Sequence, residues 1–137
     1  YAGLIPAVPH LHGGEVPAVL DGGPDAWFTS STGFSGSAYY TMGQLQGEPS
    51  PGNYAVYRYP NKQEGANIWF HDHGLGITRL NVYAGLAGAY IIRDPVNDPP
   101  NLPPLIPLVI QDRMFDTNGQ LVFPNIGINL EHPYWIP

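Results

Sequence analysis

The sequence predicts an all-β protein, a β-sandwich of short strands joined by turns. Three observations lead to this prediction. The chain has 137 residues, and a β-sandwich needs only about 100. Its 17 glycines and 16 prolines are more typical of turns than of a helical protein. The hydrophobic fraction of 43% is enough for a packed core.

Charge and composition exclude several classes of function. The formal net charge is -6 with only five lysines and arginines, so we expect no nucleic-acid partner. No apolar run approaches the roughly 20 residues that cross a bilayer, so no membrane span is expected. The chain has no cysteine, so any metal must be held by nitrogen and oxygen atoms. Because the first residue is Tyr1 rather than methionine, we expect a processed product or a piece of a longer protein.

The first half of the chain contains two expected strands. Glycine and serine crowd residues 29–37, which predicts a loop. The alternation in 54–59 is typical of a strand, and 67–73 is also expected to be extended. In 81–94, Gly85 and Gly88 disfavour a long helix.

The second half is expected to be less regular. The proline density of residues 94–107 excludes both a helix and a central strand, which predicts a surface connection. Residues 108–115 are expected to form a strand that returns through an Asn118–Gly119 turn as a hairpin. Residues 125–137 have no clear period and are expected to connect to a further domain.

Four of the five histidines occur in two identical pairs, His10 with His12 and His71 with His73. Residues i and i+2 of a strand face the same side about 6.5 Å apart, so each pair would point in one direction. Two such pairs on adjacent strands would present up to four imidazoles to one pocket. Neutral imidazole suits copper, zinc, iron and nickel. The doubled spacing therefore predicts one shared metal site.

The remaining candidates have less specific patterns. Strand alternation points Asp72 away from the histidines, so we expect it to support the ligands or to have a structural role rather than to bind metal. His132 has no partner at metal-ligand spacing and is interpreted as an ordinary surface or loop residue. Large aromatic residues of a sandwich usually pack in its core, which is expected of Trp27, Trp69 and Tyr83.

Four motifs cover nearly the whole chain: "HLHGG", "DGGPDAWFT", "YRYPNKQEGANIWFHDHGLGITRLNVYAGLAGAYIIRDP" and "LVIQDRMFDTNGQLVFP". Together they resemble the first cupredoxin domain of multicopper oxidases, especially bacterial and spore-coat laccases, with bilirubin oxidase and phenoxazinone synthase as relatives. The resemblance implies a cupredoxin-like Greek-key β-sandwich. The family has strands before its first histidine motif, whereas few residues precede His10, so we expect residues 1–137 to be an incomplete segment of an N-terminal cupredoxin domain.

The resemblance also implies roles for single residues. His10 would bind a type 2 copper ion, and His12, His71 and His73 would bind a type 3 pair. Asp21 lies where the family has an acidic residue that is linked to proton delivery. A role in the turn of "LDGG" is an equally good interpretation of Asp21.

Members of this family reduce dioxygen to water with electrons from phenol-like or metal-ion donors. The donor is oxidised at a type 1 copper, which needs a cysteine, two histidines and usually a methionine. The chain has no cysteine, so Met42 and Met114 are interpreted as core or loop residues. We therefore expect other segments of the oxidase as partners, and no activity from this chain alone. The resemblance favours an extracellular, periplasmic or spore-surface setting.

Two alternatives remain open from the sequence. One is a two-domain cupredoxin such as a copper nitrite reductase, although the doubled histidine pattern suits a trinuclear cluster better. The other is a non-catalytic sandwich that binds zinc or copper for stability, or no metal.

Overall fold

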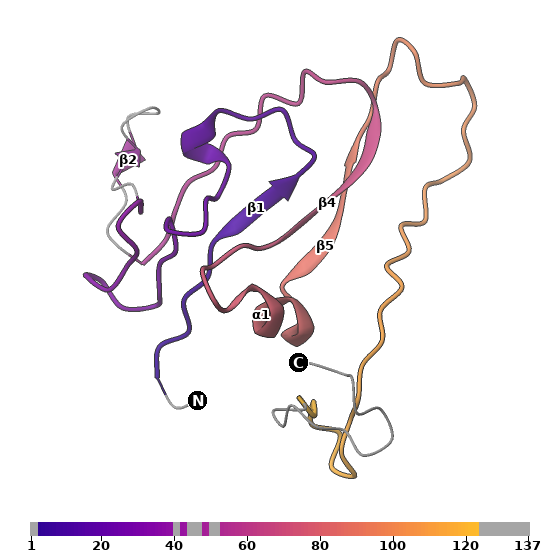
Figure 1. Ribbon diagram of the computed structural model, residues 1–137. Helices are drawn as coiled ribbons and strands as arrows, with labels where there is room; N and C mark the ends of the chain where they lie inside the picture. The colour runs from indigo at the N-terminus through magenta and orange to yellow at the C-terminus, as the bar shows by residue number, and fades with distance from the viewer. Residues whose placement is uncertain (1–2, 40–41, 44–47, 50–52, 124–137) are drawn as a thin grey trace.

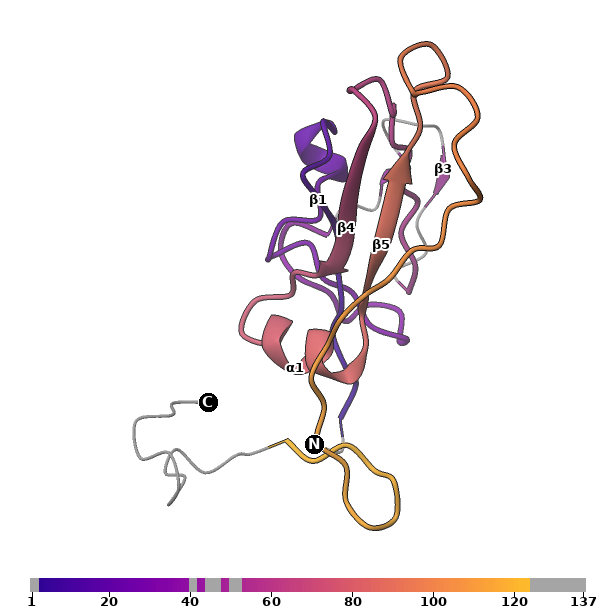
Figure 2. The same cartoon turned by 90° about the vertical axis from the view of Figure 1, so that its right-hand side faces the viewer.

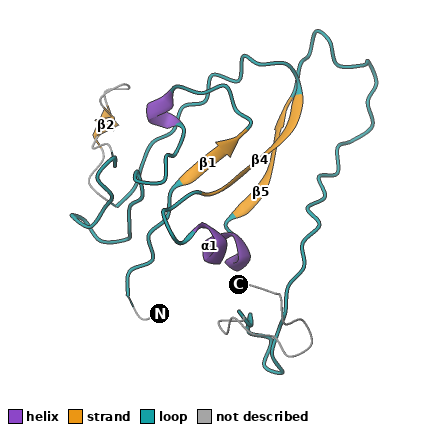
Figure 3. Cartoon of the chain, viewed as in Figure 1, coloured by secondary structure: helices purple, strands orange, loops and turns teal. Residues whose placement is uncertain are grey.

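The computed structural model describes residues 3–39, 42–43, 48–49 and 53–123. Its largest element is an antiparallel sheet of β1 (Pro9–His12), β4 (Ala66–Asp72) and β5 (Ala87–Ile92), in the order β1-β4-β5. β2 (Met42–Gly43) and β3 (Glu48–Pro49) form a separate antiparallel pair. Figure 1 shows the three main strands side by side, and Figure 3 shows how much of the chain is loop. The predicted all-β class is confirmed, and the open sheet is consistent with an incomplete cupredoxin-like fold.

The sequence of the central strand β4 favours an extended, paired conformation. Its residues "ANIWFHD" include β-branched and aromatic side chains, which favour a pleated, half-buried surface. β1 pairs with it from Pro9 opposite Asp72 to His12 opposite Trp69, and β5 pairs along its other edge. Because side chains alternate across a strand, His71 and Trp69 lie on the same face of the sheet.

Among the described residues, two short helices accompany the strands: the 3₁₀ helix η1 (Ala18–Leu20) and α1 (Thr78–Ala84), which joins β4 to β5. Gly85 ends α1 with a φ of 117°, and its backbone N–H donates to Val82. This left-handed conformation favours glycine and confirms that Gly85 prevents a long helix. No helix among the described residues has the length and apolarity needed to cross a bilayer.

The buried core lies around the start of β1. Val8, Leu11 and Leu20 are fully buried. The buried side-chain amide of Asn81 donates to the carbonyl of Pro6 over 2.8 Å, which ties the segment before β1 to α1. These contacts fix the position of β1, and hence of its histidines, relative to β4 and α1.

Residues 94–123 leave the sheet as a long arm (Figure 2). Residues 94–107 form no helix or strand. The predicted turn at Asn118–Gly119 is confirmed, because Gly119 has a φ of 77° and a bridge joins Phe115 to Leu121 on either side of it. Residues 125–137, expected to be a connector, lie outside the described residues.

Two strand predictions are wrong. Residues 54–59 form no strand, and of the predicted strand 108–115 only Phe115 pairs, in an isolated bridge to Leu121. Alternation describes only which side chains could share a face, whereas a strand also needs a neighbouring backbone to pair with. The carbonyl of Tyr54 instead accepts a hydrogen bond from the Tyr39 hydroxyl at 2.5 Å. On the arm, Leu108 and Ile110 are 80% and 97% exposed, so no apolar burial stabilises a strand there.

Candidate metal centre

The pairing of β1 with β4 brings the two histidine pairs together. His10 lies directly opposite His71 in the register, and His12 lies opposite Trp69. Directly opposed side chains of an antiparallel pair have Cβ atoms about 5 Å apart. His73 follows β4 by one residue, and its backbone N–H donates to the carbonyl of Val8 over 2.9 Å. All four imidazoles are therefore held at one end of the two strands.

The imidazoles of His10, His12 and His71 form the closest group. One ring nitrogen from each lies within 4.8 Å of those of the other two. The ring of His73 stacks on that of His10 with centroids 4.7 Å apart, and its centroid is 5.7 Å from that of His71. The structure thus brings together all four histidines that the sequence singled out.

Backbone carbonyls orient three of the rings. The Nδ1 atoms of His10, His71 and His73 lie 2.6, 2.6 and 3.1 Å from the carbonyl oxygens of Asp21, Asp72 and Gly22, respectively. A carbonyl only accepts hydrogen bonds, so each Nδ1 carries the proton. In the neutral ring the lone pair is then on Nε2, which is the atom left to bind a metal.

His12 has a different arrangement. Its Nδ1 lies 3.2 Å from Nε2 of His71. The lone pair of His71 is on this Nε2. The contact is therefore favourable when a proton or a cation lies between the two nitrogens. Two imidazole nitrogens that share a tetrahedral ion at about 2.0–2.1 Å are separated by about 3.3 Å. The pair therefore fits one shared metal ion.

The turn after η1 positions Asp21 and Gly22 next to the imidazoles of His10 and His73. An Oδ1 of Asp21 lies 3.3 Å from Nδ1 of His10, and its side chain is 46% exposed. Gly22 has a φ of 73°, and a Cβ there would collide with the carbonyl of Pro9. Only glycine fits this close approach, which lets the Gly22 carbonyl reach His73.

Asp72 is structural, which confirms its expected role. Its carboxylate is buried and accepts hydrogen bonds from the backbone N–H groups of Val8 and Gly74, at 2.8 and 3.1 Å. Its backbone carbonyl accepts the His71 ring N–H. Asp72 thus joins the segment before β1, the turn after β4 and one imidazole.

The expectation that Trp69 lies in the core is wrong. Trp69 is 43% exposed, and its ring centroid is 4.4 Å from that of His71 and 5.3 Å from that of His12. The alternation that paired His71 with His73 also places Trp69 on their side of β4, so the sequence contained this signal. Trp27 and Tyr83 are half-buried.

Of the other candidates, Met114 is the one whose side chain the structure describes. Met114 is half-exposed in the hairpin of the arm. Met42 is in β2, whose side chains are not described, and His132 lies outside the described residues.

An open β-sheet with a cluster of imidazoles at one end of its strands defines a β-protein with a candidate transition-metal centre. Residues 34–97 match the family model for "Multicopper oxidase". The laccase of Bacillus subtilis (strain 168) is 40% identical over 97% of this chain and 25% of its own length. Multicopper oxidase LPR1 of Arabidopsis thaliana is 39% identical over 98% of this chain and 22% of its own length. Bilirubin oxidase of Albifimbria verrucaria is 33% identical over 88% of this chain and 18% of its own length.

The chain is similar to multicopper oxidases over nearly its whole length. It spans about a quarter or less of the length of these relatives, since the covered shares are 25%, 22% and 18%. Similarity to this family implies copper, and the imidazole cluster of His10, His12 and His71 fits copper because neutral imidazole is one of its preferred ligands.

Proposed function

We propose that this chain supplies half of the histidine ligands of a trinuclear copper cluster in a laccase-like multicopper oxidase. The assembled enzyme reduces dioxygen to water while phenol-like donors are oxidised at a type 1 copper in another segment. We further propose that residues 1–137 are a segment of its N-terminal cupredoxin domain. The observation that carries the proposal is the convergence of ring nitrogens from His10, His12 and His71 within 4.8 Å.

The ring geometry supports a division of the ligands among copper ions. His12 and His71 would bind one type 3 ion, because their facing nitrogens are 3.2 Å apart. His73 lies outside the group of three and would bind the second type 3 ion through Nε2. His10 would bind the type 2 ion, the role that the family resemblance gives it.

Bound copper ions would supply the electrons that dioxygen accepts. The chain's own residues hold and orient the ligands, since carbonyls of the turn and of β4 fix three imidazoles with Nε2 unprotonated. Asp21 is the proposed proton carrier. Its carboxylate is accessible to solvent and lies 3.3 Å from the His10 ring, so it could take protons from water and hold them beside the cluster.

The donor site lies outside this chain in our proposal. A type 1 copper needs a thiolate, and the sequence has no cysteine. The chain therefore requires other segments of the oxidase as partners, and by itself it would show no oxidase turnover. Those segments would also decide which reducing substrate is used.

Replacement of His71 tests this proposal in the assembled oxidase. His71→Ala should deplete type 3 copper and abolish oxygen reduction, while electron uptake at the type 1 copper persists. The matched control His132→Ala should keep full copper and full turnover. Copper content, the electron paramagnetic resonance spectrum and oxygen consumption measure these effects. Full copper and turnover in His71→Ala would refute the ligand assignment, and zinc in the protein as isolated would favour a non-catalytic metal-binding module.

A further inference from the structure

Trp69 contacts the two imidazoles that share the shortest nitrogen–nitrogen distance in the cluster. Its ring lies 4.4 Å from His71, centroid to centroid, with an interplanar angle of 34°. It lies 5.3 Å from His12 with an interplanar angle of 36°. One indole therefore packs against both rings whose nitrogens are 3.2 Å apart.

Of the four clustered histidines, His12 depends most on a packing contact to fix the orientation of its ring. Among the residues that the structure describes, the other three clustered histidines each place Nδ1 beside a backbone carbonyl, whereas Nδ1 of His12 faces His71. His12 is also exposed, so little packing restricts its side-chain torsions. An aromatic plane beside a ring restricts its rotation without occupying either nitrogen.

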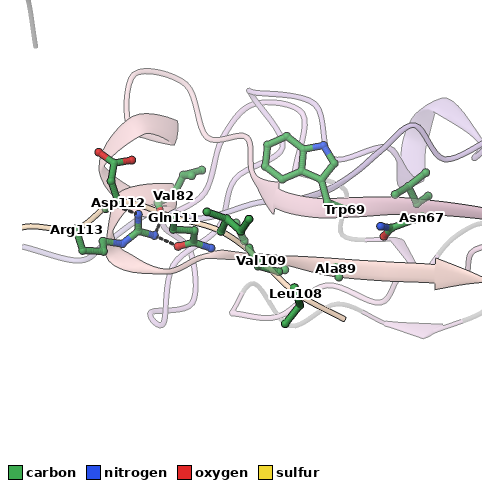
Figure 4. A pocket seen from close by; sticks show the side chains of 13 residues that line it. Asn67, Trp69, Val82, Ala89, Leu108, Val109, Gln111, Asp112 and Arg113 are labelled. Carbon is green, nitrogen blue, oxygen red and sulfur yellow. Dashed lines mark hydrogen bonds between the residues drawn. The ribbon is translucent and has the colours of Figure 1, made fainter. Parts of the chain in front are cut away.

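The indole also borders a pocket on the same face of the sheet. Trp69, Asn67 and Ala89 line this pocket of about 470 Å³ together with Val109 and Gln111 of the arm (Figure 4). Neither His12 nor His71 lines it. Trp69 thus has the imidazoles on one side and the pocket on another, which explains why a large aromatic residue of the central strand remains 43% exposed.

We propose that Trp69 is a positioning residue of the metal centre. It holds the rings of His12 and His71 in the orientation that directs both nitrogens to one ion, and it separates these rings from the pocket. This inference rests on the proposed function, because it assumes that the histidine cluster binds metal. It goes further by assigning a role to a side chain that offers no ligand atom.

Phe70 provides a matched control. It is the next residue of the same strand, has a similar exposure of 40%, and points to the opposite face, where it packs over Gly88. Replacement of either aromatic residue removes a similar apolar surface from β4. Only replacement of Trp69 removes an aromatic ring that contacts the imidazoles.

The first measurement uses the full 137-residue chain without metal, with its histidines labelled at ¹³Cε1. The ring current of an indole shifts the resonances of imidazoles stacked against it. Trp69→Leu, which keeps an apolar side chain but removes the aromatic plane, should move the His71 and His12 signals and leave that of His132 unchanged. Trp69→Phe should restore part of the shift, and Phe70→Leu should not move these two signals.

The second measurement titrates the same proteins with Zn²⁺, a redox-inert probe of imidazole sites. Trp69→Leu should weaken binding about tenfold, in the range found when groups that orient metal ligands are removed. Trp69→Phe and Phe70→Leu should stay within about threefold of the unsubstituted chain. Equal affinity in Trp69→Leu and the unsubstituted chain would overturn the inference, as would unchanged His71 and His12 signals.

These measurements and the test in the assembled oxidase separate the two proposals. If His71→Ala keeps full copper and turnover in the assembled oxidase, the proposed function is contradicted, and the inference that depends on it falls as well. If Zn²⁺ binds and requires His71 but does not depend on Trp69, the proposed function stands and the positioning role is refuted.

Discussion

The buried carboxylate of Asp72 offers the sharpest test of how the site is held together. Asp72→Asn changes the shape of the side chain very little, but an amide has one acceptor oxygen and one donor group. Both carboxylate oxygens accept a backbone N–H, from Val8 at 2.8 Å and from Gly74 at 3.1 Å. In the variant, one of these N–H groups must face another donor.

The cost follows from this single lost bond. A hydrogen bond to a charged acceptor contributes about 1.5–3 kcal/mol, and a buried donor without a partner has a cost of similar size. The amide should keep the shorter bond to Val8, so the turn at Gly74 is expected to loosen. We expect a loss of about 2 kcal/mol, which corresponds to about 1 M in the urea midpoint at a typical slope of about 2 kcal/mol per M.

Asp116→Asn is the matched control. Its exposed carboxylate also accepts two backbone N–H groups, from Asn118 and Gln120, but both bonds go to the same oxygen. An asparagine can keep both, so its midpoint should change by less than about 0.3 M. Urea unfolding followed by circular dichroism gives both values. A midpoint for Asp72→Asn within 0.3 M of the unsubstituted protein, by the same estimate, would refute the reasoning.

Three further predictions concern the turns and the acidic residues. Gly22→Ala should lower the unfolding midpoint and weaken metal binding, since its Cβ would collide with backbone and its φ is 73°, whereas Gly23→Ala, with no atom near its added Cβ, should leave both unchanged. Hydrogen bonds from the Asn97 side chain and from the backbone hold the pKa of Asp94 below its ordinary value of 3.8. The stability that these bonds contribute is therefore present at neutral pH and lost only as the pH falls below 3.8. The protection factor of the Asn97 amide, which corrects for intrinsic exchange, should fall there, and Asp94→Asn should remove this acid-dependent step. Asp21→Asn keeps the backbone carbonyl that orients His10, so it should retain copper but slow oxygen reduction; lost copper would instead assign Asp21 a structural role.

The local parts of the site could be predicted from the sequence. The spacing of His10 with His12 and of His71 with His73 determines a common side for each pair, because strand alternation is a property of the backbone itself. The same alternation correctly turned Asp72 away from the cluster. It also placed Trp69 beside His71, but the general tendency of tryptophan to be buried led to the wrong prediction of a core position.

Strand pairing could not be predicted in the same way. Residues 54–59 alternate as strands do, and residues 108–114 begin with an apolar run, yet neither segment forms a strand. Whether a segment becomes a strand depends on a partner backbone and on buried area, and both come from parts of the chain distant in sequence.

The sequence by itself determined the β class, the absence of thiolate ligands and the face on which each histidine lies. The tertiary structure decided that His10 pairs opposite His71, that the Gly22 carbonyl, 51 residues away in the sequence, orients His73, and that His12 faces His71 across 3.2 Å. The physical reason is the distance along the sequence over which each interaction acts. Side-chain alternation is fixed by neighbouring peptide units, whereas register and ring orientation depend on hydrogen bonds that form only when distant segments meet.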